Sequence, residues 1–380
     1  MASTTSGELM SLPTEILFHV FKELPPQTLA VVSQLSRRLN VIAERTLYAS
    51  VHIMDSISPE SPTPWRTYRW CESVFKRLSF VDTMHKVHVR WQSDGSPPPL
   101  PQYFIAFCER LGESLQHLHY LESLELQLGP ANRISPLSRD PMHAVERVLK
   151  RCRFPLLQAC SLGADYNKGN AQPYTHVLAH FLASHSGLMS LKIPDYHAAL
   201  NLPITSLHQL STFRGSPDTA ASLLPGRSIQ HLALNGQDTD LMRMLPMMSG
   251  TPFPILTLDL NSMAARISLL RSVATYLPTL ETLRIRLALR HTLHYAFTGI
   301  RILTGLSAVL SSFVQLAWLD LAGTELGGIR GKNDSEDERA LCFEWHRACP
   351  TLRRITFPSK NEYILHQAFW CLALVQNQSR

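Results

Sequence analysis

The sequence contains no long uncharged apolar run, and this absence argues against a membrane-spanning helix. Its first residues, MASTTSGELMS, have neither the basic start nor the apolar stretch of a secretory signal peptide. Charge is also sparse, because 17% of the residues are charged, the formal net charge is +6, and no long basic block occurs. We therefore expect a soluble protein of the cytoplasm and/or nucleus, with no membrane partner, and nucleic acid is not an expected partner.

Paired cysteine motifs are missing as well. Seven cysteines, an odd number, are spread from Cys71 to Cys371 without a CxxC pair. This pattern argues against a disulfide framework or a zinc finger and predicts reduced thiols, most of them in the core. Cys342, His346 and Cys349 stand at positions i, i+4 and i+7, but the same spacing describes the core face of a helix, and no fourth ligand is signalled nearby.

The common enzyme motifs are absent too. The sequence has no Walker A motif, no GxGxxG after a strand, no HExxH and no GxSxG, and no local nucleophile motif surrounds any thiol. We therefore predict no catalytic residue, no metal and no cofactor, and we expect that the protein is not an enzyme. An enzyme that uses a thiol or an adventitious metal is the alternative in this class.

What the sequence does contain is a dense helical pattern between Leu12 and Val51. Pro13 and Glu15 suit the first turn of a helix, and apolar residues then recur at helical spacing. The LPP triplet at residues 24–26 must end this helix, because proline supplies no amide donor and restricts the residue before it. Two short helices are expected to follow. A bundle of about 40 residues buries only a minor core, so part of its apolar face is expected to be an interface.

This stretch resembles the F-box. The similarity is carried by LPTEI at residues 12–16, LPPQTL at residues 24–29 and LSRRLN at residues 35–40. The resemblance implies docking onto a Skp-family adaptor and, through it, onto a cullin of a ubiquitin ligase. The residues that it implies for adaptor binding are Leu12, Pro13, Ile16, Leu17, Leu29 and Val32. An ordinary three-helix bundle packed on the rest of the chain is the alternative.

From about Met84 onward a short pattern recurs, apolar-x-x-apolar-x-apolar. The member at Leu207 fits it least well, because Thr212 occupies the last apolar position. Helical stretches lie between the members, so strand and helix alternate. This alternation predicts parallel strands joined by crossovers in an α/β fold, whose units must stack because none covers its own apolar face. The pattern begins at ten positions, Met84, Leu121, Leu157, Leu188, Leu207, Ile229, Ile255, Leu280, Leu316 and Leu352.

The repeats resemble leucine-rich repeats, although the asparagine that usually closes each strand is missing. Together with the N-terminal stretch they resemble the F-box proteins with irregular leucine-rich repeats that are abundant in fungi. The resemblance implies a small helical F-box bundle followed by a solenoid of parallel strands and helices. We expect a flexible N-terminus at 1–11, the F-box-like module at 12–51, a linker and packing segment at 52–83, and the solenoid at 84–380. Residues 361–376, dense in large apolar side chains, are expected to cap it.

Every second residue of a strand points away from the core, so these residues form the expected recognition surface. An exposed aromatic with arginines nearby is typical of a binding hot spot. Arg284 and Arg286 share a strand face and are expected to hold a phosphate or carboxylate group, which suits an acidic or phosphorylated client. A solvated strand face is the alternative for any single residue. The predicted client-binding residues are Arg284, Arg286, Trp318 and Arg354.

These observations lead to the hypothesis of a substrate-receptor subunit of a Skp-cullin-F-box type ubiquitin ligase. The F-box would dock the adaptor, and the repeat domain would bind a client protein destined for ubiquitin-dependent degradation. The mechanism that the resemblance implies is positional, because holding the client raises the effective concentration of its lysines near a ubiquitin-loaded enzyme. The alternative is an F-box and leucine-rich-repeat interaction scaffold that acts outside a ubiquitin ligase.

Overall fold

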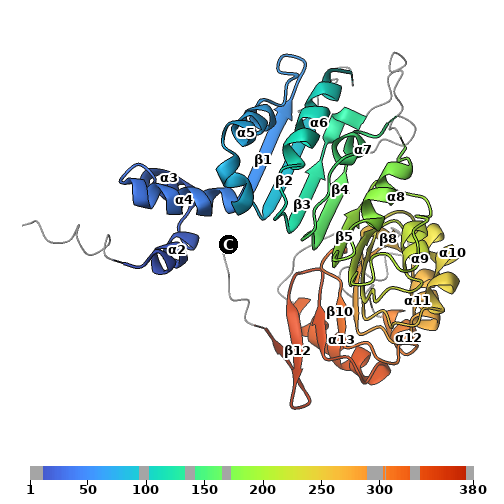
Figure 1. Cartoon of the computed structure of the whole chain (residues 1–380). Coiled ribbons are helices and arrows are strands. Elements are labelled where there is room, and N and C mark those ends of the chain that lie inside the picture. The colour runs from blue at the N-terminus through green and yellow to red at the C-terminus, as the bar shows by residue number, and fades with distance from the viewer. Residues whose placement is uncertain are drawn as a thin grey trace, which may run out of the picture. The chain divides into compact units, whose positions relative to one another are not determined.

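The structure, a computed structural model, describes residues 12–93, 102–132, 142–164, 173–288, 303, 305–325 and 334–373 (Figure 1). The expected flexible N-terminus, residues 1–11, lies outside the described residues, as does the end of the expected cap, residues 374–376. The chain divides into two compact units, Met1–Leu188 and Met189–Arg380. Each unit has its own layer of strands and its own helices.

From residue 12 onward, the described part of the first unit opens with three helices: α2 (Thr14–Lys22), α3 (Pro26–Val32) and α4 (Arg37–Ala49). The helix break predicted at the LPP triplet is present, since α2 ends at Lys22 and Pro26 is the first residue of α3. Ser36 caps α4, because its Oγ accepts a hydrogen bond from the backbone N–H of Leu39 at 3.2 Å. Local sequence signals therefore set the ends of these helices.

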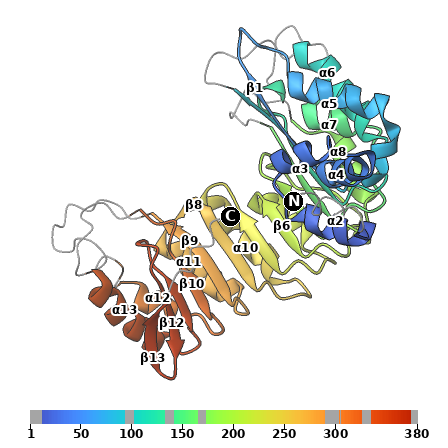
Figure 2. The same ribbon diagram turned by 90° about the vertical axis from the view of Figure 1, so that its left-hand side faces the viewer.

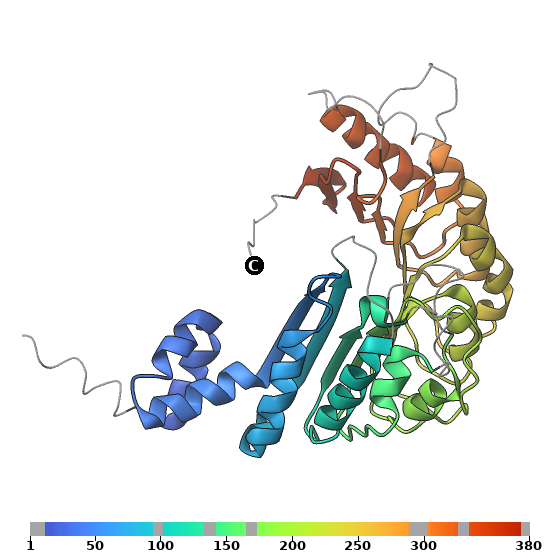
Figure 3. The same ribbon diagram turned by 90° about the horizontal axis from the view of Figure 1, so that it is seen from above.

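The rest of the first unit alternates strands with helices. Its strands run parallel and pair in chain order: β1 (Ser50–Ile57), β2 (Lys86–Ser93), β3 (Ser123–Gln127) and β4 (Ala159–Gly163). Its helices are α5 (Trp65–Lys76), α6 (Gln102–Leu115), α7 (Ala144–Leu149) and α8 (His176–Ala183), with two 3₁₀ helices, η1 (Leu78–Thr83) and η2 (Gly129–Asn132). Helices α5 to α7 lie along one face of the strands (Figures 1 and 3).

The expected linker and packing segment, residues 52–83, holds most of β1 and all of α5. The Asp55 carboxylate caps α5 by accepting from the backbone N–H groups of Arg66 at 2.8 Å and Thr67 at 3.0 Å. Thr67 Oγ1 in turn accepts from the indole N–H of Trp91 on β2 at 2.9 Å. The first strand and helix pair, β1 and α5, therefore precedes Met84. Its strand follows the same apolar template, which YASVHI at residues 48–53 matches.

The second unit repeats the arrangement. Its parallel strands are β5 (Ser190–Ile193), β6 (Thr212–Gly215), β7 (His231–Leu234), β8 (Thr257–Ala265), β9 (Thr282–Leu287), β10 (Trp318–Asp320) and β11 (Arg354–Thr356). Figure 2 shows β8, β9 and β10 lying side by side. Its helices are α9 (Pro217–Leu223), α10 (Asp238–Ser249), α11 (Ile267–Tyr276), α12 (Ser307–Leu310) and α13 (Asp334–Ala348). The predicted α/β fold of stacked strand and helix repeats is confirmed.

Ten strands, β2 to β11, correspond to the ten predicted segments. In nine of them the strand begins two residues after the first apolar residue, as β3 does after Leu121. The fifth segment was placed three residues too early, because β6 begins at Thr212 and the template therefore starts at Leu210 rather than Leu207. Phe213, fully buried, is the core residue of this strand, which explains why a polar residue seemed to interrupt the pattern.

The register between repeats is fixed by the backbone just before each strand. The N–H groups of Gln158 and Ala159 both donate to the carbonyl oxygen of Glu122 in the preceding repeat, at 2.8 and 3.0 Å. The same double donation precedes β3 and each strand from β6 to β11. Because one carbonyl receives two successive donors, a slip of one residue would break both bonds and turn the leucines out of the core.

Residues of the expected cap form an antiparallel hairpin, β12 (Glu362–His366) and β13 (Phe369–Leu372), which continues from β11. Glu338 of α13 is fully buried and holds the hairpin entry, because its carboxylate accepts from Ser359 Oγ at 2.6 Å and Asn361 Nδ2 at 2.9 Å. A buried carboxylate with two donors is a strong local tie. The parallel repeats thus end in a differently paired element.

Candidate docking surfaces

The three N-terminal helices share a small apolar core. Leu17 and Phe21 of α2 lie against Leu29 of α3 and against α4, and partly buried leucines close the margins of the cluster. Arg38 ties α4 to the start of the bundle by donating to the Leu12 carbonyl oxygen at 2.5 Å. The fully buried cluster consists of Leu17, Phe21, Leu29, Leu39, Ile42 and Ala43.

Several large apolar side chains of this bundle stay outside that core. Ile16 and Val20, one turn apart on α2, expose 47% and 46% of their surface. Val31, Leu35 and Val41, from α3, the turn after it and α4, are more than half exposed. A helix that has apolar residues both in the core and on its solvent side fits a module that binds a partner with its remaining apolar surface. We call Ile16, Val20, Val31, Leu35 and Val41 the apolar surface of the bundle.

The structure separates the six residues predicted to bind the adaptor into three kinds. Pro13 and Ile16 are exposed, and Leu12 and Val32 are partly buried beside the core. Leu17 and Leu29 have exposed fractions of 0% and 3%, so in this structure they shape the bundle from inside and do not present a contact surface.

Sequence reasoning missed Val20, Val31, Leu35 and Val41 as candidate contacts. Leu35 lies in the turn before the third helix and is exposed. Ser36 carries the signal that places it there, because a serine that caps a helix leaves the preceding residue outside it.

A second candidate surface is the strand face opposite the helices in the second unit. Residues alternate along β9 between the buried core and this open face, which carries Arg284 and Arg286. Trp318 on β10 pairs in register with Arg354 on β11. The Arg354 guanidinium lies 4.0 Å and the Arg284 guanidinium 4.7 Å from the centre of the Trp318 ring. The structure therefore brings three of the four predicted client-binding residues together as a cation–π cluster.

Carboxylates within the same surface already pair with two of these arginines. Arg354 Nε lies 2.8 Å from Glu362 Oε1, and Arg284 Nε lies 3.7 Å from Asp320 Oδ2. The Trp318 indole N–H donates to Thr356 Oγ1 at 3.2 Å. The arrangement thus matches its own charges, and Arg284 contacts both Trp318 and Asp320.

The cysteines follow the sequence prediction of core thiols, because six of the seven are buried and only Cys371 is exposed. Burial raises the pKa of the Cys71 thiol to about 11 and that of Cys108 to about 12, and it also raises the pKa of Cys342. Thiols with raised pKa values are poor nucleophiles at neutral pH. Within the described ranges, no three histidine, cysteine or acidic side chains are grouped so as to hold a metal ion.

Among the helices that the structure describes, none combines the length and the apolar character needed to cross a bilayer. This finding concerns α2 to α13 and the described residues between them.

Comparison with known proteins identifies the N-terminal bundle. Residues 9–54 match the family model described as F-box-like. No curated protein matches the sequence. Among solved structures, the chain is similar to the one titled "Crystal structure of Rad7 and Elc1 complex in yeast", with 11% identity, a TM-score of 0.34, and coverage of 85% of this chain and 88% of that chain. A likeness of this size carries no functional argument. The family match agrees with the three helices and their shared core, and the N-terminal bundle of this protein is therefore an F-box-like domain.

Proposed function

We propose that this protein is the substrate-receptor subunit of a Skp-cullin-F-box type ubiquitin ligase. The observation that carries the proposal is the apolar surface of the F-box-like bundle, where five aliphatic side chains remain about half exposed or more after the core is complete. Apolar area gains about 25 cal/mol for each Å² removed from water, so such a surface favours a protein partner. A Skp-family adaptor is the partner that an F-box implies.

The client side of the proposal rests on the open face of the second unit. Trp318 and its flanking arginines have the composition of an interface hot spot, and they project from short strands held in place by the repeat core. The strands supply a rigid frame, whereas the outward side chains vary without cost to the core. The receptor would hold its client there and contribute no chemical step of its own.

A reducing compartment, the cytoplasm or the nucleus, belongs to the same proposal. All seven cysteines are free thiols, and six of them pack in the core as small apolar groups. Such a chain does not depend on disulfides for its stability.

The direct test is co-expression of the full chain with a Skp-family adaptor, followed by size-exclusion chromatography. We expect a stable one-to-one complex. The double variant Ile16→Asp, Val20→Asp should lower adaptor affinity by about 100-fold, because it places two carboxylates in an apolar contact. Met247→Asp, on an exposed position of α10 in the other unit, is the matched control and should leave affinity unchanged.

A wild-type chain that stays soluble and elutes apart from the adaptor would show that the bundle serves only internal packing. Addition of a cullin to a co-purified complex then separates the receptor from a scaffold outside the ligase. The receptor gives a ternary complex, whereas a scaffold of that kind leaves the cullin unbound.

A further inference from the structure

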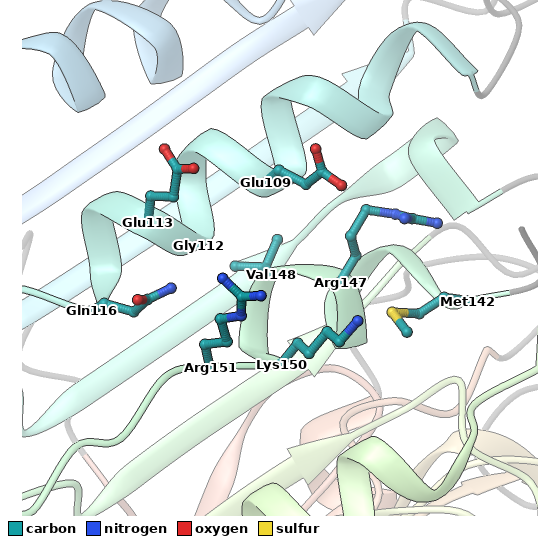
Figure 4. A pocket seen from close by; sticks show the side chains of 9 residues that line it. All are labelled: Glu109, Gly112, Glu113, Gln116, Met142, Arg147, Val148, Lys150 and Arg151. Atoms are coloured by element: carbon teal, nitrogen blue, oxygen red, sulfur yellow. The ribbon is translucent and has the colours of Figure 1, made fainter.

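A cavity of about 350 Å³ opens between α6 and α7 in the helical layer of the first unit. Figure 4 shows the side chains around it. One wall is formed by Glu109, Glu113 and Gln116, and the other by Arg147, Lys150 and Arg151. Because the cavity lies in the helical layer and not on the open strand face, an activity there would be separate from client binding at Trp318.

The floor of the cavity is held in place by a close helix contact. Gly112 of α6 lies against α7 so tightly that a Cβ atom there would stand 2.6 Å from the carbonyl oxygen of Val148. Cys152 adds a second tie, because its thiol donates to the carbonyl oxygens of Val148 at 3.3 Å and of Gly112 at 3.6 Å. The two walls are therefore set at a fixed spacing that leaves room for a ligand.

The basic wall contains three cations from the C-terminal end of α7 and the turn after it. Arg147 lies in α7, Lys150 is its C-cap residue and Arg151 follows, so the three are close along the chain. Within the described part of the chain, Lys150 and Arg151 have no ion pair or side-chain hydrogen bond. Like charges at this spacing repel one another, and an anion placed among them would relieve the repulsion.

Among the described residues, the acidic wall forms no ion pair with Lys150 or Arg151. Glu113 lies 3.2 Å from Arg110 Nη1, and the same guanidinium contacts Glu72 at 2.9 Å through Nη2. In Figure 4 the Glu113 carboxylate points away from Arg151, while the Arg151 side chain rises toward α6. Glu109 is the remaining carboxylate of the lining, so positive charge predominates in the cavity.

A cation near the end of a helix is by itself an ordinary feature, because it interacts favourably with the negative end of the helix dipole. That effect accounts for Lys150, the C-cap residue of α7. It does not account for the presence of three cations in the lining of a single cavity.

We propose that this cavity binds a phosphate group, with Arg147, Lys150 and Arg151 as its cationic donors. Guanidinium groups match the geometry of phosphate oxygens through paired N–H donors, and the ammonium of Lys150 adds a point charge. The Gln116 side chain, which reaches toward Arg151 in Figure 4, supplies a neutral donor at the rim. The ligand class is an inorganic phosphate ion or the phosphate of a modified side chain.

Isothermal titration of the full chain with inorganic phosphate at constant ionic strength, set with chloride, tests the site. Lys150→Ala combined with Arg151→Ala should weaken binding by at least about tenfold, since two of the three cationic donors are removed. Arg69→Ala combined with Lys76→Ala, on exposed positions of α5, removes the same charge outside the cavity and should leave binding unchanged.

Glu109→Gln provides a test in the opposite direction and should tighten phosphate binding by about threefold, because it removes a nearby negative charge that repels phosphate.

A parallel titration with O-phosphoserine distinguishes the two sources of the phosphate group. Tighter binding of phosphoserine assigns the site to a phosphorylated side chain, and tighter binding of free phosphate assigns it to the ion. Equal affinity in the wild type and the Lys150, Arg151 variant would reduce the finding to an adventitious ion, and absence of heat with both probes would overturn the proposal.

Discussion

The apolar surface of the F-box-like bundle and the open face of the second unit are exposed in physically different ways. On the bundle, the exposed side chains are aliphatic and carry no group that forms hydrogen bonds with water or with a neighbour; they belong to Ile16, Val20, Val31, Leu35 and Val41. On the open face, Arg284 and Arg354 both contact the Trp318 ring, and each pairs with a carboxylate of the same surface. The first surface is incomplete in the isolated chain, whereas the second is nearly self-sufficient.

This difference teaches how the two surfaces should recognise their partners. An apolar surface gains free energy from almost any complementary apolar partner, and its affinity follows buried area and packing. A charge-matched surface gains binding free energy only when a partner replaces the existing ion pairs with stronger ones, because every arginine must first be desolvated. Under the proposed function, the bundle is suited to one constant partner, and the open face is suited to selection among clients.

The largest expected effect compares two adjacent residues of α2. Leu17→Ala should lower the free energy of unfolding of the bundle by about 2 to 5 kcal/mol, because it opens a cavity in the core. Ile16→Ala should change that stability by less than about 0.5 kcal/mol while it weakens adaptor binding. Chemical denaturation followed by adaptor titration measures both quantities. Similar effects of the two variants would contradict the placement of Leu17 in the core and Ile16 on the surface.

A smaller effect is expected from Trp318→Ala. The two cation–π contacts are each worth about 0.5 to 1 kcal/mol, so the variant should lose about 1 to 2 kcal/mol of stability in the second unit. Adaptor affinity should be unchanged. Phe253→Ala, an exposed aromatic of the same unit, is the control and should have little effect on stability. Loss of adaptor binding in the Trp318 variant would contradict the separate roles of the two surfaces.

The charge matching of the open face is tested by a double-mutant cycle on Arg354 and Glu362. Arg354→Ala, Glu362→Ala and the double variant should give a coupling energy of about 0.2 to 1 kcal/mol, because the pair is partly exposed. The coupling should fall as salt is raised. Thermal unfolding at low and high sodium chloride measures it. A coupling of zero at low salt would mean that the face is solvated and not self-paired.

The smallest expected effect concerns the stability of the buried core, which supports both surfaces. His185 is buried, its Nε2 accepts from the backbone N–H of Phe154 at 3.0 Å, and burial lowers its pKa from the usual 6.5. Because the folded pKa lies below the unfolded value, the contribution of this neutral imidazole is complete above pH 6.5. It is lost as the pH falls from there through the folded pKa.

His185→Gln should therefore flatten the pH dependence of stability below pH 6.5, where the wild type loses stability as the unfolded chain takes up a proton. Denaturation midpoints measured from pH 7.5 to 5.0 report this slope. His231→Gln, at an exposed strand position, is the matched control and should keep the wild-type slope. A slope that does not change in the His185 variant would assign the acid sensitivity to other groups.

Much of the fold followed from local patterns. The proline pair after Leu24 divided the bundle, and the apolar template located ten strands because each repeat buries the same positions. The template failed by three residues at β6, where Leu207 and Leu210 are both buried and a sequence pattern has no means to choose between them. It also began too late, at Met84, because β1 stands directly after the helical module and most of it falls in the expected linker and packing segment.

The candidate surfaces were less predictable. The resemblance supplied Leu17 and Ile16 as equivalent adaptor residues, yet one is fully buried and the other is half exposed. The cluster of Arg284, Trp318 and Arg354 was found because strand alternation places them on one face. That Asp320 and Glu362 would pair with two of its arginines depends on which strands are neighbours. The basic cavity between α6 and α7 had no signal in the sequence.

The sequence by itself determined where helices and strands form and which residues face the core, because those properties depend on spacing along one chain segment. It also identified the F-box-like module, since that signature is contiguous. Only the tertiary structure decided which apolar residues remain exposed, which charges pair and where a cavity opens. Those properties arise between segments that are distant in sequence, and their free energies depend on a few ångströms of separation that no local pattern contains.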